Sequence, residues 1–287
     1  MSVESSELPR SVISPAALLT SFTQLGSFLS GLWDRRDLIL EMTWRDIGQQ
    51  YAGQILGAFW SIVHPIFLAA VYVFIFAVVF HTKISQEMPL NYTAYLLAGL
   101  IPWLGIQQSL VKSSIAFTGQ ANLVKQVVFP IEVLVATSLL APLFSQLVGI
   151  LFAFAYILFS YGTLPATALL LPIALLLQLT FFFGLGLILA SLTSFVRDIK
   201  DIVVLTSIAG VYLVPAFYLP QWVPAIFKPI LYINPLSYVI WVYQDCLYYG
   251  QLVHWWAWLV MCALAGSTLW FGFIFFRRLR PYIANVL

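Results

Sequence analysis

Residues 45–80 read RDIGQQYAGQILGAFWSIVHPIFLAAVYVFIFAVVF, and much of the architecture follows from them. The stretch begins with an Arg–Asp pair and three glutamines, and Gly53 and Gly57 form a G-x-x-x-G pair before the apolar part. Residues 58–80 are almost wholly apolar, and about 20 such residues let a helix cross the hydrocarbon core of a bilayer. The stretch therefore predicts a polar, amphipathic segment joined to a membrane span without a linker.

The composition places the whole chain in a membrane. Of its 287 residues, 62% are hydrophobic and 8% are charged, and the mean hydropathy is +0.95. Soluble domains carry about 25% charged residues. Five further stretches are comparably apolar, at 91–111, 130–160, 166–194, 202–219 and 253–276. We predict an all-α integral membrane protein with six transmembrane helices.

The positive charges fix the direction of these spans. If the N-terminus lies inside, eleven lysines and arginines fall in the cytoplasm, and only Lys83 and Lys228 fall outside. Cytoplasmic loops carry an excess of positive charge, so both termini are expected in the cytoplasm.

The segment 219–250 is apolar enough to suggest a seventh span. A seventh span would put the basic residues 277–280 outside, and four prolines within 219–250 remove backbone donors. Asn234 followed by Pro235 is typical of a helix start. We predict two short half-helices at the outer face between spans five and six, covering an outer vestibule; the alternative is a plain hydrophobic loop.

The residues before the first span form amphipathic helices rather than spans. Apolar residues recur at spacings of three and four after Ser14–Pro15, and again after residue 37. The second apolar face is predicted to consist of Leu40, Trp44, Ile47, Tyr51 and Ile55. The chain thus divides into an N-terminal extension with an amphipathic helix (1–32), an interface helix (33–57), a membrane domain (58–276) and a tail (277–287). The interface helix either anchors the chain at the membrane surface or docks a cytoplasmic partner.

Several classes of function lack support in the sequence. No acidic residue falls in the middle of a predicted span, whereas proton-coupled transporters place ionisable groups there. The chain has no phosphate-binding loop for ATP, no catalytic constellation and no metal-ligand spacing. Its net charge of +2 gives no reason to expect nucleic acid as a partner.

Five motifs in chain order resemble a known family. The segment WRDIGQQYAGQILGAFWSIVHP (44–65) looks like the interface helix and first span of ABC-2 permeases that export polysaccharides and teichoic acids. Four later segments resemble the same family: YLLAGLIPW (95–103), NLVKQVVFPIEVL (122–134), VRDIKDIV (196–203) and INPLSYVIWVYQDCLYYG (233–250). Many members have an arginine before the acidic residue of the last motif, where this chain has Gln244–Asp245. The role of that position stays open.

The resemblance implies a homodimeric permease that binds two copies of a separate ABC ATPase. It implies export of a lipid-linked polysaccharide, such as an O-antigen or capsule, across the bacterial inner membrane. ATP and Mg²⁺ would be bound by the partner, and this chain would hold no cofactor, metal or catalytic residue. The residues expected to couple the two subunits are Arg45, Asp46, Tyr51, Lys125, Phe129, Glu132, Arg197 and Asp198.

Aromatic residues provide a candidate substrate path, because sugars stack on aromatic rings. The chain has 23 Phe, 14 Tyr and 10 Trp. The path residues are predicted to be Phe59, Trp60, Tyr72, Tyr212, Phe217 and Tyr218. Two alternatives remain: an ABC-2 exporter of a small molecule or lipid, and a membrane-embedded enzyme that acts on a lipid-linked glycan.

Overall fold

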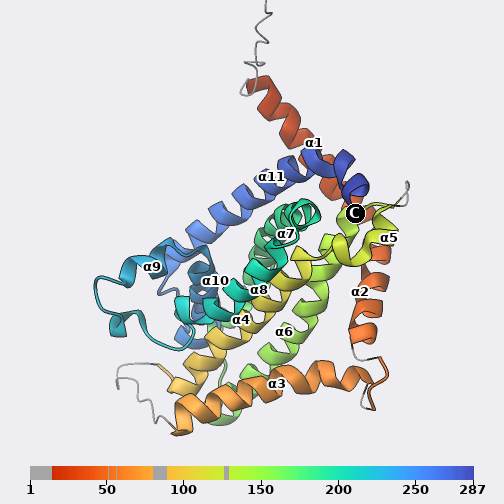
Figure 1. Ribbon diagram of the computed structural model, residues 1–287. Helices are drawn as coiled ribbons and strands as arrows, with labels where there is room; N and C mark the ends of the chain where they lie inside the picture. The colour runs from red at the N-terminus through yellow and green to blue at the C-terminus, as the bar shows by residue number, and fades with distance from the viewer. Residues whose placement is uncertain (1–14, 51, 56, 80–88, 126–128) are drawn as a thin grey trace, which may run out of the picture.

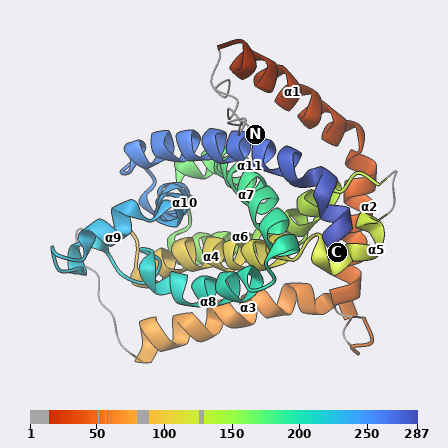
Figure 2. The same cartoon turned by 45° about the horizontal axis from the view of Figure 1, so that its top comes forward.

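A computed structural model describes residues 15–50, 52–55, 57–79, 89–125 and 129–287 of the chain. Every regular element within these residues is a helix, as the sequence predicts. The helices form one bundle, from which the N-terminal helix α1 leaves beside the C-terminal part of α11 (Figures 1 and 2).

Four helices in the described residues are long and apolar enough to cross a membrane. They are α4 (Tyr92–Ser114), α6 (Glu132–Tyr161), α7 (Leu171–Phe195) with the 3-10 turn η4 (Ala166–Leu170) before it, and α11 (Trp255–Val286). They correspond to the second, third, fourth and sixth predicted spans. Helix α11 continues through most of the segment predicted as a tail, so the chain stays helical to Val286.

The first predicted span is helical but changes its winding. After a 3-10 turn, η1 (Gly57–Phe59), helix α3 (Trp60–Val73) continues as the π-helical segment η2 (Phe74–Val79). A regular α-helix rises about 1.5 Å per residue, so the 14 residues of α3 span about 21 Å, and η2 extends the helix further. The described helix is shorter than the four long spans.

The fifth predicted span is shorter than expected. Helix α8 (Ile199–Gly210) and the 3-10 turn η5 (Val211–Leu213) end well before residue 219. Pro215 explains the end, because the residue before a proline favours extended backbone, and Val214 has φ −122° and ψ 155°. The expectation of a regular span over 202–219 is therefore wrong in its second half.

Close helix packing holds the bundle together, both around α4 and between α7 and α11. Every residue in the first half of α4 except Thr93 is buried. Helices α7 and α11 touch backbone to backbone: a Cβ added to Gly272 would lie 2.2 Å from the carbonyl oxygen of Gly184. Glycine at both positions lets the helix axes approach this closely.

The segment between α8 and α11 contains the predicted half-helices. After the turn η6 (Pro220–Trp222) come α9 (Lys228–Ile233), α10 (Pro235–Gln244) and the π-helical segment η7 (Asp245–Tyr249). The Asn234 side chain accepts a hydrogen bond from the Leu236 backbone at 3.0 Å, which confirms the predicted N-cap. Residues 239–244 are all buried, so α10 inserts among α4, α7 and α11 instead of lying on the surface.

The N-terminal helices are α1 (Pro15–Asp34) and α2 (Arg36–Gln50). The buried residues of α2 are Ile39, Met42, Thr43 and Ile47. Of the predicted apolar face, Ile47 is buried, while Leu40, Trp44 and Ile55 are more than half exposed. Tyr51 lies outside the described residues.

The chain turns sharply between α2 and α3 (Figure 1). Gly53 and Gly57 have φ of +79° and +49°, a region that glycine adopts at little cost. Neither glycine has a neighbour close to its Cβ direction, so both serve the bend and not a close helix contact.

Candidate functional site

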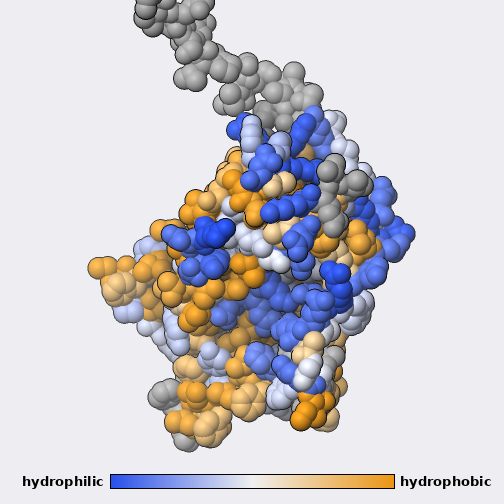
Figure 3. All heavy atoms as spheres, turned by 45° about the vertical axis from the view of Figure 1, so that its right-hand side comes forward, coloured by the Kyte–Doolittle hydropathy of each residue, from blue (hydrophilic) through white to orange (hydrophobic). Residues whose placement is uncertain are grey.

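Most of the described candidate coupling residues lie at one end of the bundle. This polar end is formed by α2, by η3 (Thr118–Gln120) and α5 (Ala121–Val124), by the turn before α8, and by the last residues of α11. Figure 3, in which this side comes forward, shows hydrophilic residues gathered over it. Two cavities of about 260 and 160 Å³ open here, and residues 118–121 contribute to both.

Arg45 and Asp46 line the larger of these cavities, between α2, the end of α4 and the start of α6. Lys112 Nζ donates to Asp46 Oδ2 at 2.7 Å and to Gln50 Oε1 at 3.2 Å. Arg45 is exposed. Asp46 therefore ties α2 to α4, while Arg45 is the member of the pair that a partner could reach.

Glu132, by contrast, is buried and forms ion pairs within the chain. Its side chain is 5% exposed and lies 3.0 Å from Arg35 Nη1 and 3.5 Å from Arg280 Nη2. The carboxylate thus joins the first residue of α6 to the α1–α2 junction and to α11. Glu132 itself is not accessible to a partner, whereas Arg35 and Arg280, with which it pairs, are partly exposed.

The remaining coupling candidates are spread over the same end. Arg197 and Asp198 are exposed in the turn between α7 and α8, and Arg197 lines the smaller cavity with Lys200 and Leu287. Lys125 is exposed after α5, and Phe129 packs partly against the apolar cluster around Phe117 and Phe276. The sequence thus predicted surface positions at this end, with Glu132 as the buried exception.

The path candidates fall into two groups. At the far end of α3, the ring of Phe217 stacks on Tyr72 with centroids 5.3 Å apart and on Phe76 at 5.0 Å. Tyr212 lies 5.7 Å from Phe217 and is 61% exposed, while Phe217 is 4% exposed. Phe217 is therefore the buried centre of the cluster, and Tyr212 is its exposed ring.

The other path candidates do not join this ring face. Phe59 and Trp60 are exposed at the beginning of α3, a whole helix away from Tyr72. The Tyr218 hydroxyl donates to the Tyr212 carbonyl at 2.9 Å, which fixes the turn that carries both residues. The six residues do not form one continuous surface in the single chain.

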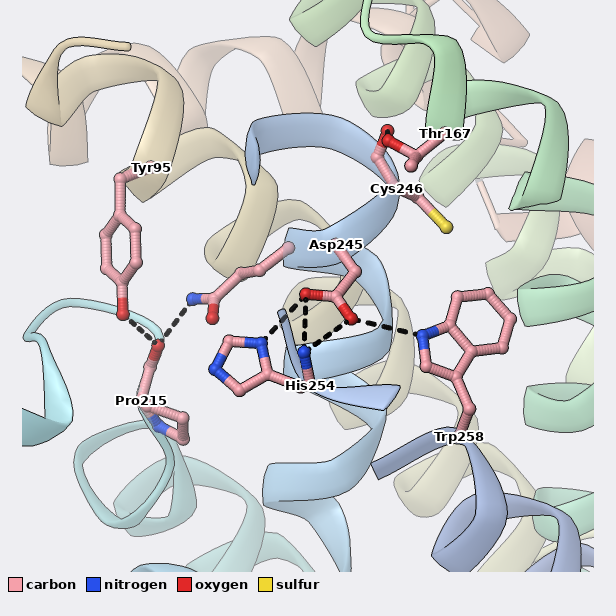
Figure 4. A network of polar contacts seen from close by, with 8 residues as sticks. Tyr95, Thr167, Pro215, Asp245, Cys246, His254 and Trp258 are labelled. Carbon is pink, nitrogen blue, oxygen red and sulfur yellow. Dashed lines mark hydrogen bonds and ion pairs between the residues drawn. The ribbon is translucent and has the colours of Figure 1, made fainter. Parts of the chain in front are cut away.

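Asp245 is a central residue whose role the sequence left open. Its side chain is fully buried and accepts hydrogen bonds from the His254 backbone N–H at 3.0 Å, His254 Nδ1 at 2.8 Å and Trp258 Nε1 at 3.2 Å (Figure 4). The neighbouring Gln244 donates to the Pro215 carbonyl at 2.7 Å, to which Tyr95 also donates. The pair Gln244–Asp245 thus fastens η7 to the start of α11 and to the break after α8.

A second polar cluster lies inside the helices themselves. Gln146 on α6 and Gln178 on α7 exchange hydrogen bonds of 3.0 and 2.8 Å, and Tyr243 on α10 donates to Gln178 at 2.5 Å. All three side chains are buried. The sequence carries a signal for this cluster, because each of two strongly apolar stretches contains a single glutamine. A glutamine side chain inside the membrane needs a hydrogen-bond partner on another helix.

Within the residues described, no group of three or more His, Cys, Asp or Glu side chains is placed to hold a metal ion. Together, the apolar helices and the polar end define a multi-span helical membrane protein with charged residues gathered at one end of the bundle. A family model described as ABC-2 type transporter matches residues 37–248, so the chain belongs to that family of transporters.

Curated relatives agree with this assignment. The chain is 30% identical over 254 residues to an O-antigen export system permease protein RfbA of Klebsiella pneumoniae, covering 88% of this chain and 95% of the relative. A second RfbA of the same species is 30% identical over 218 residues, covering 75% of this chain and 82% of the relative. An RfbA of Myxococcus xanthus is 27% identical over 257 residues, covering 88% and 96%.

Proposed function

We propose that this chain is the membrane subunit of an ATP-driven exporter that moves a lipid-linked polysaccharide of the O-antigen type across the bacterial inner membrane. The observation that carries the proposal is its likeness to O-antigen export permeases over nearly their whole length. Two chains would pair, each binding one copy of an ABC ATPase that supplies the ATP and Mg²⁺ chemistry. The termini would lie in the cytoplasm, as the distribution of positive charge favours.

The polar end supports this division of labour. It gathers exposed charges from α2, from 118–125 and from the turn before α8, which are far apart in the sequence. Force applied there reaches the membrane helices by three short routes: the bend after α2, the Asp46–Lys112 pair and the Glu132 ion pairs. A polysaccharide needs a protein-lined path, because each unsatisfied polar group in hydrocarbon costs several kcal/mol.

Copurification tests the proposal most directly. The tagged chain, extracted gently from its native membrane, should carry an ABC ATPase with it, and deletion of the chain should remove the surface polysaccharide. Absence of any ATPase, together with unchanged surface polysaccharide, would rule out the proposed exporter. Loss of a small lipid with normal polysaccharide would favour the alternative cargo.

The docking role of α2 can be separated from its internal contact. We expect Arg45→Glu to weaken ATPase copurification, because losing one charge of an interfacial pair costs about 2–5 kcal/mol. Asp46→Lys should weaken it too, but the swap Asp46→Lys with Lys112→Asp should restore it if Asp46 acts by holding α2. Lys228→Glu on α9 is the control for insertion. Normal copurification of the Arg45 variant would remove this residue from the interface.

The exposed ring of Tyr212, in the cluster with Tyr72 and Phe217, offers a test of the predicted substrate path. Tyr212→Ala combined with Tyr72→Ala should lower polysaccharide export per folded complex while ATP hydrolysis continues. Phe217→Ala should instead lower the folded amount, since deletion of a buried Phe costs about 3–5 kcal/mol. Surface polysaccharide, normalised to the complex recovered by size-exclusion chromatography, distinguishes the two effects. A double variant with normal export per complex would exclude the two tyrosines.

A further inference from the structure

The N-terminal helix α1 covers a cavity for which the proposed transport function names no ligand. The cavity has a volume of about 360 Å³ and lies between α1, the first residue of α6 and the end of α11. Its polar lining consists of Gln24, Ser27, Arg35, Glu132, Arg277 and Arg280. It is therefore built from three parts of the chain that meet only in the fold.

The lining carries an excess of positive charge. Three guanidinium groups face one carboxylate, which leaves two uncompensated charges among the lining residues. Glu132 binds Arg35 and Arg280, while Arg277 contacts the side-chain oxygen of Gln24. The side chains of Arg35 and Arg280 remain 45% and 48% exposed, so donors are left over for a ligand. Guanidinium groups bind phosphate oxygens in pairs of parallel hydrogen bonds, better than lysine does.

The surroundings point to a membrane lipid as the source of the phosphate. A second cavity of about 500 Å³, lined almost only by apolar side chains, lies against α1 as well. It involves Leu140 of α6 and Leu269 of α11, which lie eight residues from Glu132 and from Arg277 along the same helices. Eight residues of helix rise about 12 Å. Helix α1 thus lies where the bundle changes from basic to apolar, which is the level of lipid headgroups.

Exposed apolar side chains agree with this level. Trp33 is 70% exposed at the edge of the apolar cavity, and Arg36 lies over its ring at 5.7 Å. Tryptophan and arginine are both favoured at the boundary between hydrocarbon and headgroups. A soluble anion would not need the apolar cavity beside its site.

We propose that the basic cavity binds the phosphate group of an anionic phospholipid, and that this lipid holds α1 against α6 and α11. Arg277 and Arg280 donate to the phosphate from α11, and Arg35 donates from the α1–α2 junction. The acyl chains lie toward the apolar side of α1. The chain then folds more stably in anionic than in zwitterionic lipid.

The experiment compares lipids on the full chain, purified with whatever partner it retains. In detergent, phosphatidylglycerol should raise the thermal midpoint more than phosphatidylcholine does, and native mass spectrometry should retain it on the protein. Arg277→Gln should weaken phosphatidylglycerol binding about tenfold or more, because a charge-assisted hydrogen bond is lost. Arg278→Gln, on the same turn but outside the cavity lining, should leave binding unchanged.

Further measurements distinguish a phospholipid from a soluble phosphate as the ligand. Inorganic phosphate at millimolar concentration should not reproduce the rise; if it does without lipid, the ligand is a soluble anion and the lipid assignment fails. Equal effects of the two lipids, or of the two arginine variants, would overturn the site. Arg277→Gln leaves the Glu132 ion pairs intact, so the variant should fold in phosphatidylcholine as the natural chain does. A variant that loses this baseline stability shows a structural role for Arg277 and contradicts the proposal.

Discussion

Gly272→Ala should strongly reduce the amount of folded protein, and Gly184→Ala should do the same. A Cβ at Gly272 would lie 2.2 Å from the Gly184 carbonyl oxygen, and a Cβ at Gly184 would lie 2.3 Å from the Thr268 carbonyl. Both obstacles are backbone atoms, so no side chain can rotate away. Overpacking costs about 1–3 kcal/mol, and more where the backbone itself must move. Since α7 and α11 share the most extensive helix contact in the described bundle, we expect the upper part of this range or beyond.

The same helix provides the control. Gly266 lies on α11 with no atom within 4 Å of its Cβ direction. Gly266→Ala should therefore be neutral or slightly stabilising, because alanine favours a helix over glycine by about 1 kcal/mol. Thermal unfolding in detergent and the recovered monodisperse fraction measure both changes. Equal behaviour of the Gly266 and Gly272 variants would mean that the two helices do not meet as closely as described.

Four long spans could be predicted from the sequence because a long apolar segment is stable in lipid as a transmembrane helix. The runs that became α4, α6, α7 and α11 exceed 20 residues, so length alone identifies them. The start of α10 was predictable for a local reason: Asn234 and Pro235 favour the same helix start. Signals of this kind need no knowledge of distant contacts.

The errors arise where apolar content alone was followed. The apolar residues Val214 and Ala216 gave no sign that α8 ends early, and the local signal was Pro215, which favours extended backbone at Val214. What holds the break open is Tyr95 and Gln244, which both donate to the Pro215 carbonyl from other helices. The sequence also does not show that Ile39 and Met42 of α2 face the bundle, or that Asp46 pairs with Lys112, 66 residues away.

The candidate site was predictable as a set of surface motifs and not as a network. Arg45, Arg197 and Asp198 are exposed at one end of the bundle. Glu132 forms ion pairs with Arg35 and Arg280 and so joins the α1–α2 junction, α6 and α11. The spacing of these residues in the sequence does not reveal the ion pairs. A charge in a loop and a charge in a buried ion pair look the same in one sequence.

Asp245→Ala should produce the second large loss of stability. The substitution removes the acceptor for the His254 backbone N–H, His254 Nδ1 and Trp258 Nε1, all at the beginning of α11. Each buried donor left without an acceptor costs about 1–3 kcal/mol, and three donors lose theirs. Asp201→Ala, at an exposed position on α8, is the matched control and should change the thermal midpoint little. An unchanged midpoint for Asp245→Ala would show that water replaces the carboxylate.

Substitutions at His254 then separate the hydrogen bond from ring packing. Nδ1 must donate to Asp245, since a carboxylate oxygen only accepts, and an asparagine amide can place a donor near the same point. His254→Asn should therefore lose less stability than His254→Leu. If the two lose the same, stacking of the imidazole on Trp241, with centroids 5.7 Å apart, is the larger contribution. In the double variant Asp245→Ala with His254→Leu, the losses should be smaller than their sum, because both changes break one network. Strict additivity would mean that Asp245 and His254 stabilise the η7–α11 junction independently.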